Sequence, residues 1–278
     1  MCHGHLKIDF DTQRNNCFYI GGPNGSGKSA LFASMNIGLG GRGNNNDRGN
    51  SVKMYIKDGR SKARIRLILT NRGLSSHPDF GDFVVVERTI TSSCSTYVLK
   101  KMVVSKKKAD LDQLLMRYGI QINNPIFWMT QDRSRHFLHQ MKPERLFQVI
   151  MYIRFGENVP KILEILEANA DKFEYSPRGP IGLSDYIVIS GLSGGERSFT
   201  TACFIMALWE IMEAPFRCMD EFDVFMDMIN RRVVMDLLVK LATEQYSHNQ
   251  FIFFTPQGIK ELGEREQVQV FEMPKVRQ

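Results

Sequence analysis

The sequence lacks several features that would place the chain in a specialised class of protein. No apolar stretch approaches the roughly 18 residues that a membrane span requires. The N-terminus MCHGHLKIDFD has no basic region followed by an apolar one, so we expect neither a membrane segment nor a secretory leader. There is no internal repeat and no sustained heptad pattern. The 278 residues are 43% hydrophobic and 24% charged, which is typical of one or two globular domains.

Cysteine is scarce and irregularly spaced. The absence of paired spacing indicates a reduced, intracellular protein. Two close histidine pairs, His3 with His5 and His136 with His139, have no further Cys or His at zinc spacing, so no structural zinc is expected. The five cysteines are Cys2, Cys17, Cys94, Cys203 and Cys218.

Positive charge is concentrated in one sector of the chain. The formal net charge is +6, yet Arg42 to Lys108 has 15 basic against 5 acidic residues, a net +10 that leaves −4 for the rest. One basic sector on a mildly acidic body indicates a polyanion partner. A solvated sheet face is the alternative, and charge alone does not separate the two.

The pattern of apolar residues predicts an α/β protein. NCFYI is a short buried strand and SALFASMNIGLG a helix that ends at glycines. KARIRLILT and much of FVVVERTITSSCSTYVLKKMVV alternate, which indicates antiparallel strands with one wet face, and ADLDQLLMRYGI has helical spacing. The last third alternates again: a helix from Ser198, the strand FRCM, the helix MINRRVVMDLLVKLATEQ and the strand QFIFF. This order favours a parallel α/β layer.

The sequence predicts two halves joined by a connector. Residues 145–188 contain one plausible helix, Lys161–Ala170, followed by a Pro/Gly-rich exit. We therefore expect an N-terminal half at 1–144 and a C-terminal half at 189–278.

The stretch Gly22-Pro-Asn-Gly-Ser-Gly-Lys-Ser29 fits the phosphate-loop pattern G-x-x-x-x-G-K-[ST]. Its glycines let backbone N–H groups close on phosphate, Lys28 would reach the β- and γ-phosphates, and Ser29 would hold Mg²⁺. A strand before the loop and a helix after it favour this interpretation over a chance glycine-rich turn. The candidate nucleotide-binding residues here are Gly22, Asn24, Gly25, Ser26, Gly27, Lys28 and Ser29.

Two carboxylates follow a short apolar strand in FRCMDEFD. At the carboxyl edge of a sheet, Asp220 can hold Mg²⁺ and Glu221 can orient and polarise an attacking water. Alone, this pattern is often only a surface turn. Gln131 in WMTQDRS also follows an apolar run and by itself indicates only a polar strand end.

A second glycine-rich segment completes an ordered set. Leu192-Ser193-Gly194-Gly195-Glu196 precedes a helical run, and such a helix start presents backbone N–H groups to an anion. Phosphate loop, L-S-G-G-E segment and Asp-Glu pair together resemble the ABC-type ATPases, and among them the heads of the structural maintenance of chromosomes (SMC) family. The resemblance covers nearly all of residues 1–142 and 190–273.

The resemblance implies a P-loop α/β head with a parallel core sheet, an antiparallel side sheet and a helical subdomain that contains the signature segment. It also implies head-to-tail pairing of two heads. Ser193, Gly194 and Gly195 would then cap ATP held by the partner head, so each chain supplies half of each active site.

Further roles follow from the resemblance alone. Gln131 would be the Q-loop residue that reaches Mg²⁺ and the water, Asp220 the Walker B aspartate and Glu221 the hydrolytic glutamate. Val224–Asp227 would be the D-loop. ATP and Mg²⁺ are the expected cofactors, with Ser29, Gln131 and Asp220 around the metal.

The resemblance also implies partners and a place in the cell. The expected partner is a related SMC head of the protein 5 type, in a heterodimer that acts on DNA in chromosome maintenance, repair and recombination, in the nucleus and on chromosomes. Arg42 and Arg48 match a basic loop that couples DNA to ATP use in related heads, and Lys53 lies near them. Thr255-Pro256-Gln257 stands where transporters usually have a histidine.

The sequence departs from the family in what it lacks. The two coiled-coil arms, most of the hinge and some outer strands of the head are not found, and the connector resembles the start of the hinge. A sheet without these strands would expose unpaired edges, and we interpret the chain as a shortened gene product or an incomplete gene model. Two alternatives stay open: a catalytically inactive head that only binds a partner or DNA, and a soluble ABC ATPase of transport.

Overall fold

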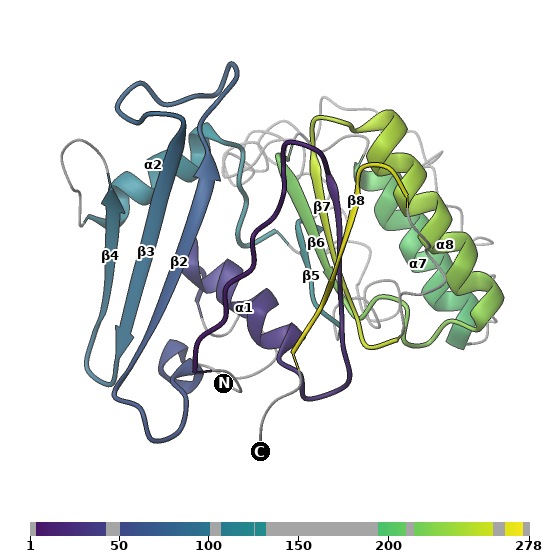
Figure 1. The fold of residues 1–278 in the computed structure, drawn as a ribbon, viewed down its shortest axis with the longest axis horizontal. Helices are drawn as coiled ribbons and strands as arrows, with labels where there is room; N and C mark the ends of the chain where they lie inside the picture. Colours follow the sequence, from purple (N-terminus) through teal and green to yellow (C-terminus); the bar gives the residue numbers. More distant parts are fainter. Residues whose placement is uncertain are drawn as a thin grey trace, which may run out of the picture.

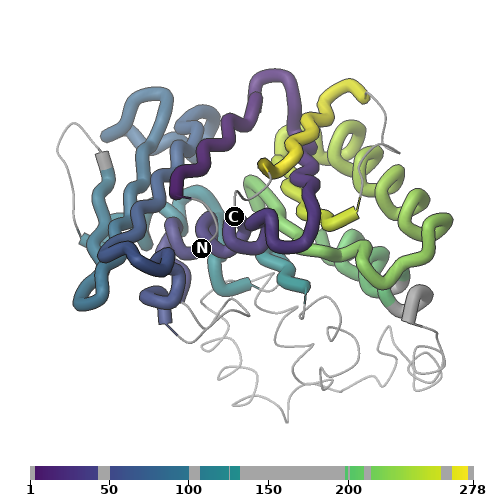
Figure 2. The backbone as a smooth tube through the Cα atoms, turned by 60° about the horizontal axis from the view of Figure 1, so that its bottom comes forward, coloured from purple at the N-terminus to yellow at the C-terminus, as the bar shows by residue number. Residues whose placement is uncertain are grey.

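The computed structural model describes residues 4–42, 51–100, 107–124, 126–131, 194–209, 214–257 and 265–274. The connector expected at 145–188, with its helix at Lys161–Ala170, lies outside the described residues. Figures 1 and 2 show the described part as two sheets with helix α1 between them.

The core is a five-stranded sheet in which every neighbouring pair of strands is parallel, in the order β5-β6-β7-β1-β8. β1 and β6 are buried along their whole length, as expected of parallel strands with both faces covered. The strands are β1 Cys17–Gly21, β5 Trp128–Met129, β6 Phe216–Asp220, β7 Gln250–Thr255 and β8 Val268–Glu272.

Helices cover both faces of this sheet (Figure 1). α1, Lys28–Gly38, packs on one face, where the ring of Phe32 lies 5.5 Å from that of Phe254. α7, Gly194–Trp209, and α8, Met228–Lys240, pack on the other, where Trp209 lies 5.4 Å from Phe251. Because successive residues of a strand point to opposite faces, the phenylalanines of β7 pack against helices on both faces of the sheet.

The second sheet is antiparallel, in the order β2-β3-β4. Its inner face packs into the same hydrophobic core as the parallel sheet, and its outer face includes the exposed side chains of Lys62, Arg64 and Arg66. Among the described residues, β2 and β4 form its two edges. The remaining elements are β2 Lys62–Thr70, β3 Phe83–Thr91, β4 Ser95–Lys100, a 3₁₀ turn at Val52–Tyr55 and α2 Lys108–Arg117.

The structure confirms the predicted α/β class and corrects some boundaries. The described part of α7 already includes Gly194–Arg197, ahead of the predicted start at Ser198; glycines are tolerated in a first helical turn because its N–H groups need no partner within the helix. The helix predicted from MINRRVVMDLLVKLATEQ is α-helical only as far as Lys240, as α8, and its last five residues, Leu241–Gln245, form a π-helical turn. β8 and the 3₁₀ turn were not predicted.

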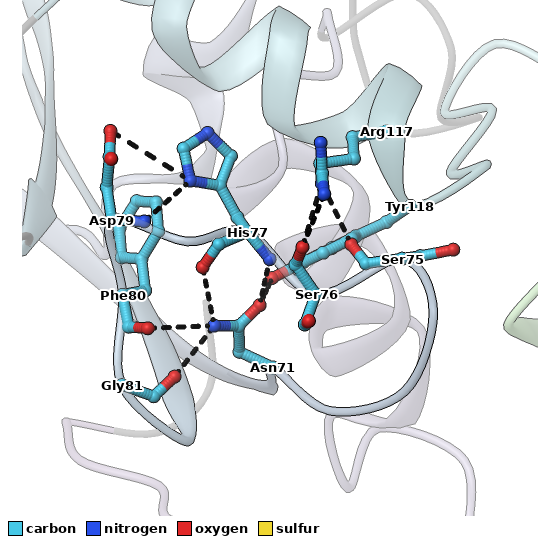
Figure 3. Close-up of polar contacts among 9 residues, drawn as sticks. All are labelled: Asn71, Ser75, Ser76, His77, Asp79, Phe80, Gly81, Arg117 and Tyr118. Carbon is cyan, nitrogen blue, oxygen red and sulfur yellow. Dashed lines mark hydrogen bonds and ion pairs between the residues drawn. The ribbon is translucent and has the colours of Figure 1, made fainter.

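The side chain of Asn71 organises the connection between β2 and β3 (Figure 3). It is 7% exposed, its Nδ2 donates to three backbone carbonyls, and its Oδ1 accepts from the His77 N–H and the Tyr118 hydroxyl. Arg117 of α2 donates to the carbonyls of Ser75 and Ser76. This loop is therefore held against α2 and is not a loose turn. The three carbonyls belong to His77, Phe80 and Gly81.

Two observations bear on the classes considered from the sequence. Among the described residues, no helix has both the length and the apolar character needed to cross a membrane. Cys17, Cys94, Cys203 and Cys218 all have free thiols, and burial raises the pKa of the Cys17 and Cys218 thiols, so these two are poor nucleophiles.

Candidate nucleotide-binding site

Two glycines shape the loop between β1 and α1. Gly27 directly precedes α1 and has a φ of 99°, a left-handed conformation that side chains rarely adopt. A Cβ atom on Gly22 would lie 2.9 Å from the Cβ of Met273 and 2.8 Å from Oγ of Ser26, so a larger residue does not fit. The loop thus leads into the first turn of α1, whose N–H groups suit a phosphate.

Lys28 lies inside this loop. Its Nζ donates to the carbonyl oxygens of Gly22 at 2.7 Å and Pro23 at 3.2 Å, and the residue is 3% exposed. A phosphate oxygen is charged and is a stronger acceptor than a carbonyl. The loop therefore holds the Lys28 ammonium group where the oxygen of a bound phosphate would replace these carbonyl oxygens as its hydrogen-bond acceptor.

The two carboxylates lie at the end of β6. Asp220 is the last residue of the strand, not the first after it, and is 4% exposed. Glu221 is half-buried and has a φ of 50°, a conformation that costs a residue other than glycine about 1–3 kcal/mol. Its N–H donates to the carbonyl of Phe254 at 2.9 Å, so the neighbouring strand β7 holds the strained residue.

Strand register brings most of the predicted residues to one edge of the core sheet. Asp220 pairs with Phe254 and Gly21 with Thr255, so the phosphate loop and the carboxylates both start at the carboxyl ends of parallel strands. Met129 pairs with Met219, and Gln131 and Glu221 each follow two residues later. Ligands of open α/β sheets bind at this edge.

The donors expected around Mg²⁺ are all oxygen atoms. Ser29 is in the first turn of α1, Asp220 ends β6 and Gln131 follows β5, which supply a hydroxyl, a carboxylate and an amide. Mg²⁺ prefers one or two carboxylates together with substrate phosphates and water, so this set fits. In the described part of the chain, no three His, Cys, Asp or Glu gather into an all-protein metal site.

The signature segment is described only in part. Ser193 lies outside the described residues, whereas Gly194 and Gly195 are the first two residues of α7. The predicted D-loop, Val224–Asp227, ends by capping α8: Oδ1 of Asp227 accepts from the N–H groups of Ile229 and Asn230, both at 2.9 Å. The roles of these segments stay predictions.

The basic residues between Arg42 and Lys108 do not all lie on the surface. Arg42 and Lys53 are exposed and Arg48 lies outside the described residues. Arg88 is 6% exposed and faces inward, and burial lowers the pKa of its guanidinium. Arg88 is therefore a core residue and does not contribute to a surface for a polyanion.

Sequence reasoning missed a buried polar cluster beside the carboxylates. Asp223 is 0% exposed; its Oδ2 accepts from Nε of Arg231 at 2.7 Å and from Oγ1 of Thr255 at 2.6 Å. The pattern D-E-F-D places Asp223 near the site, but nothing in the sequence indicates its partners.

Comparison with known proteins decides the family. A profile of the RecF/RecN/SMC N terminal domain family matches residues 4–273. The chain belongs to this family.

Among SMC relatives, the sequence resembles protein 6, as the segments GGPNGSGKSAL, NNPIFWMTQDRSRHFL and QFIFFTPQG indicate. It is 48% identical over 192 residues to structural maintenance of chromosomes protein 6 homolog smc-6 of Caenorhabditis elegans, which covers 61% of this chain and 17% of that protein. It is 37% identical over 157 residues to structural maintenance of chromosomes protein 6 of Schizosaccharomyces pombe, a match that covers 54% of this chain and 14% of that protein. The matched part is thus a small fraction of either relative.

Solved SMC heads share the fold. The head bound to the C-winged helix domain of ScpA superposes with a TM-score of 0.67 at 21% identity, covering 90% of this chain and 88% of that one. A Pyrococcus furiosus head with an extended coiled coil gives 0.61 at 18% identity, covering 86% and 83%. The predicted fold class, a parallel core with an antiparallel side sheet as in ABC-type heads, is confirmed.

Proposed function

We propose that this SMC chain is an ATP-binding head of a chromosome-maintenance and DNA-repair complex. It hydrolyses ATP after head-to-tail pairing with a related head, of the protein 5 type, and it binds DNA. Its place of action is the nucleus, on chromosomes. Family membership and the resemblance to protein 6 support chromosome maintenance over transport.

One observation supports nucleotide binding above all others. The ammonium of Lys28 lies inside a glycine loop, and that loop begins at the sheet edge where Asp220, Glu221 and Gln131 also lie. A cation, an open helix start and carboxylates at one edge together suit a triphosphate and its metal.

The residues divide the chemistry among them. Lys28 holds the β- and γ-phosphates, and Ser29, Asp220 and Gln131 would hold Mg²⁺, which neutralises charge on the phosphate oxygens when bound. Glu221 accepts a proton from the attacking water and orients it. The partner head contributes its signature segment to this ATP.

The test is a calorimetric titration of Mg·ATP into the chain, followed by ATPase assays with and without the partner head. Lys28→Ala should weaken ATP binding by about 10–100-fold, since a hydrogen bond to a charged group contributes about 1.5–3 kcal/mol. Lys240→Ala, an exposed change on α8, is the control.

The assay also separates the alternatives. Binding without hydrolysis in the presence of the partner head would favour the catalytically inactive head. Equal ATP affinity in the wild type and Lys28→Ala would contradict the proposal at its first step.

A further inference from the structure

The buried cluster beside the carboxylates joins three elements. Asp223 lies between β6 and α8, Arg231 is in α8 and Thr255 ends β7. All three are almost fully buried, at 0%, 2% and 0% exposure. Both short contacts meet at one oxygen, Oδ2 of Asp223.

This cluster fixes the far end of the segment that contains Glu221. At the near end, the Glu221 N–H donates to the carbonyl of Phe254 at 2.9 Å. At the far end, the hydroxyl of Thr255 donates to Asp223 at 2.6 Å. Two successive residues of β7, Phe254 and Thr255, therefore hold the segment Glu221–Asp223 at both ends, and Glu221, the residue at its near end, has a left-handed φ of 50°.

Stability alone is a poor explanation of this arrangement. Taking a carboxylate and a guanidinium out of water is costly, and well-packed apolar residues of similar volume often stabilise a core as well or better. Strained backbone persists only where the surroundings over-determine it, and such places are concentrated at functional sites. The cluster meets that description at the predicted hydrolytic residue.

We infer that Asp223, Arg231 and Thr255 are positioning residues that hold Glu221 in its left-handed conformation for hydrolysis. Arg231 fixes the carboxylate of Asp223 from α8, and Thr255 fixes it from β7. The inference rests on the proposed role of Glu221 in ATP hydrolysis. It adds that Thr255, the first of the three residues that stand where transporters usually have a histidine, acts through Asp223 and need not contact ATP.

The first experiment measures the geometry without any activity. Hydrogen exchange of a peptide covering 219–224 reports the Glu221 amide, which the Phe254 carbonyl protects. Thr255→Val keeps the shape and removes the hydroxyl, so this amide should exchange about 10-fold faster, as the loss of one supporting hydrogen bond implies. Thr255→Ser restores the donor and should restore protection.

Thr243→Val is the matched control. Thr243 also donates one hydroxyl hydrogen bond, to the carbonyl of Val239 at 2.9 Å, in the turn that follows α8. This variant should leave the 219–224 peptide unchanged. Unchanged exchange in Thr255→Val, or an equal rise in both variants, would overturn the inference.

The second experiment measures turnover with the partner head. Thr255→Val should lower kcat about 10-fold while the KM and the affinity for Mg·ATP stay within about twofold, because the hydroxyl positions Glu221 and not the nucleotide. Thr255→Ser should recover most of the rate. An equal loss of ATP binding and turnover would assign the cluster to the fold and contradict positioning.

The two experiments fail separately. If the wild type does not hydrolyse ATP with the partner head, the proposed function fails, and the exchange data alone decide whether the cluster fixes Glu221. If hydrolysis is normal but Thr255→Val changes neither exchange nor kcat, the proposed function stands and the inference is wrong.

Discussion

Arg88 of β3 donates from Nη1 to the carbonyl oxygen of Gly41 at 2.9 Å, across 47 positions of sequence. The same nitrogen donates to the carbonyl oxygen of Ile37 at 2.6 Å, and Nε donates to Oγ of Ser95 at 2.8 Å. The guanidinium also lies 4.7 Å from the ring of Tyr97. Arg88 therefore joins the antiparallel sheet to the end of α1, the helix that begins at the phosphate loop.

Replacing Arg88 by Met should destabilise the fold by about 1–3 kcal/mol, because the buried carbonyl oxygens of Ile37 and Gly41 both lose a hydrogen bond from the guanidinium. Urea unfolding followed by circular dichroism measures the change. Arg66→Met is the matched control, since Arg66 is exposed on the neighbouring strand and surface changes usually stay within about 0.5 kcal/mol. Equal effects of the two substitutions would contradict the joining role of Arg88.

Glu221→Gln should keep ATP bound and slow hydrolysis by about 10²–10⁴-fold, the usual contribution of a positioned base. The amide preserves the shape but accepts no proton, so the paired heads should accumulate with ATP between them. Single-turnover hydrolysis and size-exclusion chromatography with the partner head measure both effects. Turnover like that of the wild type would move the catalytic role to another residue.

The sequence predicted those parts of the molecule that local patterns control. The apolar runs of β1 and β7 and the alternation in β2 and β3 follow directly from burial on two faces or one. The glycine loop was predictable because its spacing reflects a backbone that must approach phosphate closely. These features need no knowledge of distant contacts.

Features that depend on distant partners were not predictable. Asp223 and its hydrogen-bond partner Thr255 are 32 positions apart in the sequence, and Asn71 and its partner Tyr118 are 47 positions apart. Arg88 is one of the charges that made the sector basic, and only the fold shows that its side chain faces inward. The left-handed conformation of Glu221 has no local signal either, because its backbone N–H bonds the carbonyl of Phe254 on the next strand, 33 positions away.

The cap of α8 should give the fold a component of acid sensitivity. Hydrogen bonds from the backbone N–H of Asn230, its side chain and the N–H of Ile229 hold the pKa of Asp227 below its ordinary value. The stabilisation is therefore complete above the unfolded pKa of about 3.9 and is lost as pH falls through the lower folded pKa. Asp227→Asn keeps a capping side chain but does not titrate.

Urea midpoints at pH 7, 5 and 3 test this expectation. Asp227→Asn should fall less between pH 5 and pH 3 than the wild type, while Asp58→Asn, an exposed change in a turn, should follow the wild type. Parallel curves for all three proteins would show that the Asp227 cap adds nothing to acid sensitivity.

Ser193→Arg tests the two-chain active site. The substitution should leave ATP binding by the lone chain nearly intact, because under the proposed pairing the signature segment would serve ATP on the partner head. It should block ATP-dependent pairing, since the bulk and charge fall where the N–H groups of Gly194 and Gly195 must close on phosphate. Ser92→Arg, in the exposed turn between β3 and β4, controls for added charge. If the mutation abolishes nucleotide binding in the folded monomer, the segment serves its own phosphate loop.

The basic sector should bind DNA through phosphates, without sequence preference. Arg42 and Lys53 are exposed, as are Lys62, Arg64 and Arg66 on the outer face of β2. Affinity should then fall steeply with salt, by a slope of about −0.9 per neutralised phosphate on a log–log plot.

Reversing Arg48 and Lys53 to Glu should weaken binding to all sequences alike and reduce the magnitude of that slope by about 1 for each phosphate that is no longer neutralised. Fluorescence anisotropy with two duplexes of unrelated sequence, at several salt concentrations, measures both quantities. Lys240→Glu, on α8 of the core layer, is the control for a charge reversal outside the basic sector and should change neither. Because counterion release requires a salt dependence wherever phosphates are neutralised, a flat response, or no binding at low salt, would favour a solvated sheet face over a DNA-binding surface.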